Sequence, residues 1–86
     1  MKRIFIAGRY SADNVIDILT NIAEGTRLST EILLLGYAPF CPWFDYQFHL
    51  YLRDNETLSL SDYYNYTMEW LRVSDAVLVL SNSKNS

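Results

Sequence analysis

Cysteine, glycine and long apolar runs are scarce in this sequence, and each scarcity argues against a class of protein. Cys41 is the single cysteine, so no disulfide can form within the chain. No signal peptide precedes the first apolar run, Ile4–Ala7, and we therefore expect a protein of the reducing cytoplasm. The three glycines supply neither a GxGxxG fingerprint nor a P-loop. The longest apolar run, Ile32–Leu35, is far shorter than the roughly 20 residues that cross a bilayer.

Basic residues and histidine are also few. The formal net charge is −3, so the chain offers no basic patch for the phosphates of polymeric nucleic acid or for an anionic membrane. His49 is the only histidine, and it has no cysteine, second histidine or obvious carboxylate at a metal-ligand spacing, so we interpret it as a loop residue. Polymeric nucleic acid, membranes and metal ions are therefore not expected among the partners.

Short apolar segments predict three strands in a chain that is half hydrophobic and 20% charged, as in globular proteins. Ile4–Ala7, closed by Gly8, lacks a polar residue and predicts a strand covered on both faces. Residues 76–80 predict a third strand of the same kind. Between them, residues 37–41 predict a second strand, which Pro39 confines to an edge because proline cannot donate a hydrogen bond to the sheet.

Two segments predict helices. The first runs from about residue 12 to residue 35, with Ser11 or Asp13 as its N-cap and Gly36 at its end, although Gly25 weakens the pattern near the middle. Its apolar stripe is predicted to comprise Val15, Leu19, Ile22, Thr26, Ser29 and Leu33.

The second helix begins at a capping box. Ser59 is followed three positions later by Asp62, and an apolar pattern at helical spacing continues from there. The aromatic segment of residues 43–57 is predicted to be a loop, with a turn of helix around residues 46–52.

Together these elements predict an α/β fold. With right-handed crossovers they give a Rossmann-like (flavodoxin-like) parallel sheet of strand order 2-1-3, with helices on both faces. We predict one domain over residues 1–86. No further element covers the second face and outer edge of the third strand, so either a partner subunit covers it or the domain is incomplete.

In such a sheet, ligands bind beyond the carboxyl ends of the strands where the connections diverge, which here is next to Gly8. The exposed amides of the turn Gly8-Arg9-Tyr10-Ser11 favour an anionic or hydroxyl-rich ligand group. Tyr10 either stacks on a base or covers the end of the sheet, and Arg9 either contacts a phosphate or lies in solvent. The pattern alone leaves a ligand site and an ordinary strand-to-helix turn equally open.

A second candidate segment follows the second strand and so lies at the same end of the sheet as Gly8. Asp45 and Gln47 alternate there with aromatic residues and could present a carboxylate and an amide to a heterocycle lying against a ring. The alternative is an aromatic loop packed on the core.

Three segments taken together resemble the nucleoside 2-deoxyribosyltransferase superfamily, in particular its small bacterial and phage branch: Ile4–Asn14, Pro42–Phe48 and Trp70–Leu80. The resemblance implies glycosyl transfer at C1′ of a 2′-deoxynucleoside, with no metal or organic cofactor. It implies a covalent deoxyribosyl intermediate on a glutamate, as in retaining glycosidases. It also implies a homo-oligomer in which a neighbour helps to complete each pocket.

The resemblance further assigns residues to the substrate pocket: Gly8 and Tyr10 in the first turn, and Asp45 and Gln47 after the second strand. An aspartate on the family's second helix that helps to place the sugar is matched here by Thr67. The nucleophilic glutamate of the family is expected beyond Ser86.

Two alternatives to the transferase therefore remain. One is a non-catalytic module that binds a nucleoside or nucleotide. The other is hydrolysis of a deoxynucleoside monophosphate to free base and sugar phosphate, which Arg9 would favour if it met a 5′-phosphate.

Overall fold

A three-stranded parallel sheet forms the centre of the protein in a computed structural model, which describes residues 1–8 and 13–80. The strands are β1 (Arg3–Ala7), β2 (Ala38–Phe40) and β3 (Ala76–Val79), and their order is β2-β1-β3. The predicted α/β class, the parallel pairing and the 2-1-3 order are therefore confirmed. β2 is an edge strand, as Pro39 requires.

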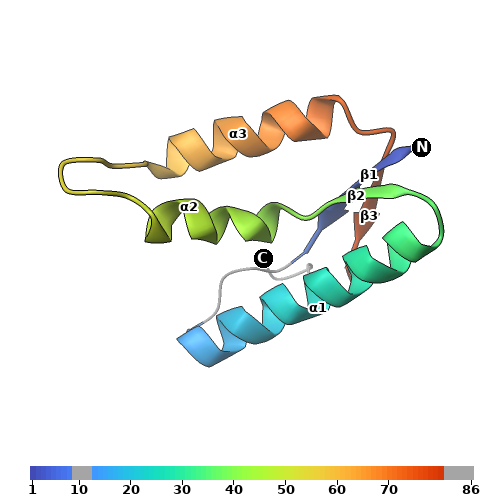
Figure 1. The fold of residues 1–86 in the computed structure, drawn as a ribbon, viewed down its shortest axis with the longest axis horizontal. Helices are drawn as coiled ribbons and strands as arrows, with labels where there is room; N and C mark the ends of the chain where they lie inside the picture. The colour runs from blue at the N-terminus through green and yellow to red at the C-terminus, as the bar shows by residue number, and fades with distance from the viewer. Residues whose placement is uncertain (9–12, 81–86) are drawn as a thin grey trace.

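Helices lie on both faces of this sheet, as predicted (Figure 1). The long helix α1 (Val15–Leu34) follows one face, and α3 (Leu60–Arg72) lies on the other side. The short helix α2 (Tyr46–Leu50) extends away from the end of β2, between α1 and α3 in this view. A short 3-10 helix, η1 (Pro42–Asp45), leads from β2 into α2. The predicted turn of helix around residues 46–52 is thus present, although it is preceded by η1 rather than by a loop.

The side chains of β1 alternate between the two faces because successive residues of a strand point to opposite sides. Ile6 is fully buried and packs in the core formed with Ile22, Ile32 and Trp43 on the α1 side. The neighbouring Phe5 faces the other side, where aromatic rings form a chain towards α3. Phe5 stacks on Phe40 at 5.8 Å between ring centroids, and Phe40 stacks on Trp70 at 5.2 Å.

The start of α1 differs from the sequence prediction. Asn14 is the N-cap, and its side-chain oxygen accepts a hydrogen bond from the Asp17 amide at 2.9 Å, so Asp13 does not have this role. Ser11, the other predicted N-cap, lies outside the described residues. Gly36 follows the helix, as predicted, and its φ of +94° is the left-handed conformation in which glycine commonly ends a helix.

The buried stripe of α1 also differs from the prediction, which is correct at Ile22 and Ser29 only. Leu19 and Leu33 are more than half exposed, whereas Gly25 and Ile32 are buried. α1 therefore turns Gly25 towards the core, where the buried ring of Trp43 packs against this glycine.

The capping box of α3 is confirmed in both directions. The Asp62 amide donates to the Ser59 hydroxyl at 3.2 Å, and the Ser59 amide donates to the Asp62 carboxylate at 2.8 Å. The hydrogen bond from the Ser59 backbone is the largest cause that lowers the pKa of Asp62. The first turn of α3 is therefore held in place by local contacts.

β3 is the exposed strand of the sheet. All four of its residues are exposed, including Val77 and Val79, which are 51% and 59% exposed. The prediction that one face and the outer edge lack cover is confirmed for the part of the chain that the structure describes. No helix among the described residues has the length and apolar character needed to cross a membrane.

Candidate functional site

The indole of Trp43 fixes the geometry at the carboxyl end of β1. Trp43 is 3% exposed and packs against two glycines, Gly25 on α1 and Gly8 at the end of β1. A Cβ added at Gly25 would lie 2.0 Å from Cζ3 of the ring, and one added at Gly8 would lie 2.7 Å from Cη2. Both glycines are therefore needed for close approach, and Gly8 does not have a positive φ.

A pocket of about 570 Å³ opens beside this contact, in the size range of small-molecule sites. We call it the strand-end pocket. It lies between Gly8, the segment of η1 and α2, and the first turn of α3. Most of its lining is apolar or aromatic, and a few polar groups are set into it, as is typical of ligand sites. The residues that carry its chemistry are Asp45, Tyr46, His49 and Tyr63.

Asp45 is the carboxylate of this pocket. It is the last residue of η1 and is half-buried, and desolvation by the surrounding groups raises the pKa of its carboxyl above the usual range. A carboxyl in these surroundings is a strong acceptor for a ligand O–H or N–H when it is ionised, and a donor when it is protonated.

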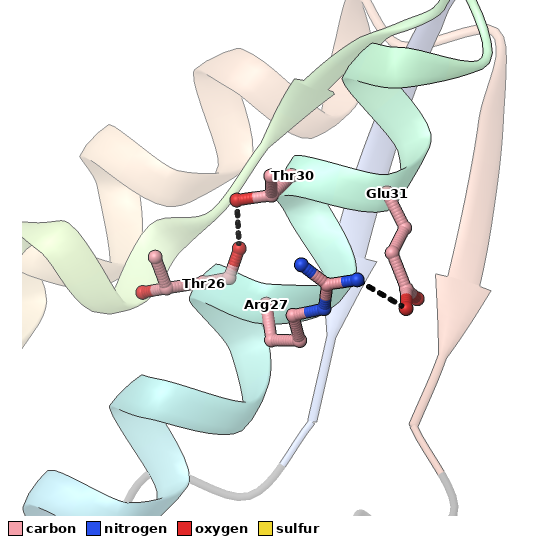
Figure 2. A network of polar contacts seen from close by, with 4 residues as sticks. All are labelled: Thr26, Arg27, Thr30 and Glu31. Carbon is pink, nitrogen blue, oxygen red and sulfur yellow. Dashed lines mark hydrogen bonds and ion pairs between the residues drawn. The ribbon is translucent and has the colours of Figure 1, made fainter.

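A second cavity, of about 610 Å³, lies beside the open edge of β2, and we call it the edge groove. Thr26 and Thr30 of α1 form one wall. Their hydroxyls donate back to the carbonyls of Ile22 and Thr26 at 2.8 and 2.9 Å, so their donor protons are used within the helix. Figure 2 shows the Thr30 contact beside the exposed ion pair of Arg27 and Glu31, in which the nitrogen and oxygen are 3.3 Å apart.

The structure brings only some of the predicted site residues together. Gly8 and Asp45 share the strand-end pocket. Gln47 lines the edge groove, to which Asp45 also contributes. Thr67 is half-buried on α3 and lines neither cavity. Arg9 and Tyr10 lie outside the described residues.

Two pocket residues were not predicted from the sequence: His49, which was interpreted as a loop residue, and Tyr63, which was not among the candidate site residues. Asp45 and His49 are four positions apart in a continuous helical segment, a spacing that places both on one side. This interval is the signal that would have found His49. No comparable interval indicates Tyr63, because Thr67, the predicted site residue on the same helix, lines neither cavity.

None of the four glutamates lines the strand-end pocket. Glu24 and Glu31 of α1 line a different, shallow cavity together with Leu80, and Glu69 pairs with Arg72 on α3. Glu56 accepts a hydrogen bond from the Arg53 amide at 2.7 Å. The only carboxylate that the described residues bring to this pocket is Asp45. Across the same residues, no three histidine, cysteine, aspartate or glutamate side chains are grouped so that they could hold a metal ion.

Comparisons with protein-family models, with curated protein sequences and with solved structures find no match to this chain. The observed sheet topology defines the fold class. For function, the molecule offers one pocket at the carboxyl end of β1, with a desolvated carboxylate and aromatic walls.

Proposed function

We propose that this chain binds a 2′-deoxynucleoside or its nucleotide in the strand-end pocket, as a nucleoside 2-deoxyribosyltransferase-like protein. The observation that carries the proposal is that Gly8 and Asp45 line one pocket. These residues come from two of the three segments that resemble the superfamily, and they are far apart in the sequence. The pocket also lies beyond the carboxyl end of the central strand, where ligands bind in parallel α/β sheets.

The lining residues suit the two halves of a nucleoside. The Tyr46 ring offers an apolar surface to a flat base. The Asp45 carboxylate and the His49 imidazole can form hydrogen bonds with sugar hydroxyls or with the edge of the base.

Transfer of the deoxyribosyl group needs a carboxylate that attacks C1′. The glutamates among residues 1–86 lie away from the pocket, so the proposed transfer or hydrolysis requires a glutamate from outside this segment. Binding without turnover is therefore the activity that we propose for residues 1–86 themselves. The exposed apolar residues of β3 support a homo-oligomer, and the free, buried Cys41 suits the proposed cytoplasmic location.

Titration calorimetry with 2′-deoxyinosine, 2′-deoxyadenosine and their 5′-monophosphates tests the binding proposal. We expect micromolar or tighter binding of at least one of these compounds. Asp45→Asn should weaken it by about tenfold or more, because the variant loses a charged acceptor. Asp54→Asn is the matched control, since Asp54 is exposed and lines neither cavity. Failure of all four compounds to bind, or unchanged binding by the Asp45 variant, would overturn the proposal.

A base-exchange assay separates the three possible activities. The chain is incubated with 2′-deoxyinosine and adenine, and the products are separated by chromatography. Formation of 2′-deoxyadenosine indicates transfer. Release of free base from a deoxynucleoside monophosphate, with no acceptor base present, indicates hydrolysis. Binding without either product identifies a non-catalytic module.

A further inference from the structure

The edge groove is a cavity to which the proposed function assigns no ligand. Its volume of about 610 Å³ is in the size range of small-molecule sites, and it lies beside β2, which is an edge strand of the sheet in the described part of the chain. Pro39 has no amide hydrogen to offer at this edge, so a further β-strand would pair poorly there. A small molecule is therefore a better occupant of the groove than an extended peptide.

Oxygen atoms that can only accept hydrogen bonds lie along two walls of the groove. On α1, the protons of the Thr26 and Thr30 hydroxyls are used within the helix, and each oxygen keeps lone pairs that can accept. On β2, the Ala38 amide donates to the Lys2 carbonyl at 2.8 Å, so the backbone of Ala38 faces β1 and that of Pro39 faces away from it. The Pro39 carbonyl is therefore directed to the open edge. These walls favour a ligand that supplies the donors.

Asp45 adds a negative charge to the same cavity. It is half-buried, and it lines the edge groove as well as the strand-end pocket. No lysine or arginine among the described residues lines the groove, and neither of the ion pairs that those residues form involves Asp45. A carboxylate that is withdrawn from water without a counter-ion is unfavourable, so a bound cation would offset that loss of hydration.

Aromatic rings supply much of the remaining lining. Phe44 and Phe48 line the groove and are 45% and 47% exposed, so a ligand can reach both side chains. Phe48 packs edge to face with Tyr66, which also lines the groove, at 5.4 Å between ring centroids. Aromatic faces attract ammonium groups and also offer contact to the apolar part of a ligand.

We propose that the edge groove binds an organic ammonium ion, namely a primary amine carried on an apolar or aromatic group. The ammonium brings a positive charge to the Asp45 carboxylate and three donors to the oxygens of α1 and β2. The apolar part of the ligand lies against Phe44 and Phe48. This inference goes beyond the proposed function and does not depend on it.

The test compares an amine with a neutral molecule of the same shape. The ¹⁵N-labelled chain is titrated at pH 7 with 2-phenylethylamine, which is protonated at this pH, and separately with 2-phenylethanol, and amide chemical shifts are followed. We expect the amine to shift the amides of Thr30 and Phe48, which line the groove, and to bind about fivefold or more tightly than the alcohol.

Three variants identify the groups responsible. Asp45→Asn keeps the size of the side chain and removes its charge, so the preference for the amine should disappear. Asp54→Asn, at an exposed position outside both cavities, is the matched control and should keep the preference. Phe44→Leu removes a ring that lines the groove and not the strand-end pocket, and it should weaken binding of the amine by about twofold to fivefold.

Tighter binding of the amine in the edge groove, with the preference lost in Asp45→Asn, supports the proposal. Equal affinities of the parent chain for the amine and the alcohol overturn it, whatever the variants do. A preference that Asp45→Asn leaves unchanged, or no shift change at tens of millimolar amine, also overturns it. Shift changes centred on Gly8 and Tyr63 would place the amine in the strand-end pocket and refute the assignment to the groove. Nucleoside binding is measured separately, so this proposal and the proposed function can fail independently.

Discussion

Replacing Gly25 with alanine adds a methyl group to α1 at the point where the ring of Trp43 crosses the helix. The new Cβ would lie 2.0 Å from Cζ3 and 2.1 Å from Cε3 of the ring. Carbon atoms in good contact are about 3.5–4.0 Å apart, so the gap is short by about 1.5 Å. The ring has little room to retreat, because it is 3% exposed and other atoms of the same ring already approach Gly8.

Two effects oppose each other in Gly25→Ala. Alanine stabilises a helix interior by about 1 kcal/mol relative to glycine. Overpacking a well-filled core costs about 1–3 kcal/mol, and a clash of this size with a confined ring belongs at the upper end of that range. We therefore expect a net loss of about 2 kcal/mol in the free energy of unfolding. For a domain of this size, the Tm should fall by about 8–16 °C.

Urea unfolding followed by far-UV circular dichroism measures this loss. Ala23→Gly is the control for helix propensity, since Ala23 is exposed on the same helix, and it should cost about 1 kcal/mol. In a Trp43→Leu background, which lacks the ring, Gly25→Ala should become neutral or stabilising. If Gly25→Ala stabilises the parent chain, the contact between Trp43 and Gly25 does not have the role described above.

Three further predictions concern α3, the thiol and the pocket carboxyl. Ser59→Ala removes the capping box and should lower the free energy of unfolding, measured in urea, by about 1 kcal/mol. Ser61→Ala, at an exposed position inside the helix, is the control and should leave that free energy almost unchanged. Equal effects of the two substitutions would contradict the role of the cap. Burial raises the pKa of the Cys41 thiol, so iodoacetamide at pH 8 should alkylate the folded chain at least about tenfold more slowly than the urea-unfolded chain, and equal rates would refute this. Desolvation raises the pKa of Asp45, so the folded chain keeps this proton to a higher pH than the unfolded chain does. The contribution of Asp45 to stability should therefore fall as pH rises from the unfolded pKa, about 3.9, through the folded pKa, and Asp45→Asn should remove this fall. An NMR titration of the Asp45 carboxyl carbon with its midpoint below about 3.9 would contradict the prediction.

Features of the fold that depend on local chemistry could be predicted from the sequence. Pro39 predicted that β2 is an edge strand, because proline has no amide hydrogen to donate to a neighbouring strand in any sheet. Ser59 and Asp62 predicted the start of α3 because the hydrogen bonds of a capping box form within one turn. The parallel order followed from the alternation of strands and helices together with the handedness of crossovers.

The orientation of α1 could not be predicted in the same way. Gly25 weakened the helical pattern of the sequence, yet α1 continues through it. The ring of Trp43, which is distant in the sequence, packs against α1 at the position that a Cβ of residue 25 would occupy. Leu19 and Leu33 are apolar but remain exposed, since the helix turns Gly25 and Ile32 towards the core instead. A contact between distant segments thus decided which residues are buried.

For the candidate site, the sequence placed Gly8 and Asp45 at the same end of the sheet, and the structure has them in one pocket. Gln47 was expected beside Asp45, and the two residues do line one cavity, but that cavity is the edge groove and not the strand-end pocket. His49, four positions after Asp45 in the helical segment, shares the strand-end pocket with it instead. The place of Tyr63 in the pocket lining depends on how α3 meets the pocket, which no local pattern encodes.

A titration of the ¹⁵N-labelled chain with 2′-deoxyinosine, followed by amide chemical shifts, examines ligand binding and its location in one experiment. We expect the largest shift changes at Gly8, Asp45 and Tyr63, which line the strand-end pocket. Changes centred instead on Thr30 and Phe48, which line the edge groove, would place the ligand in the wrong cavity. The absence of any change at millimolar nucleoside would contradict the proposed function.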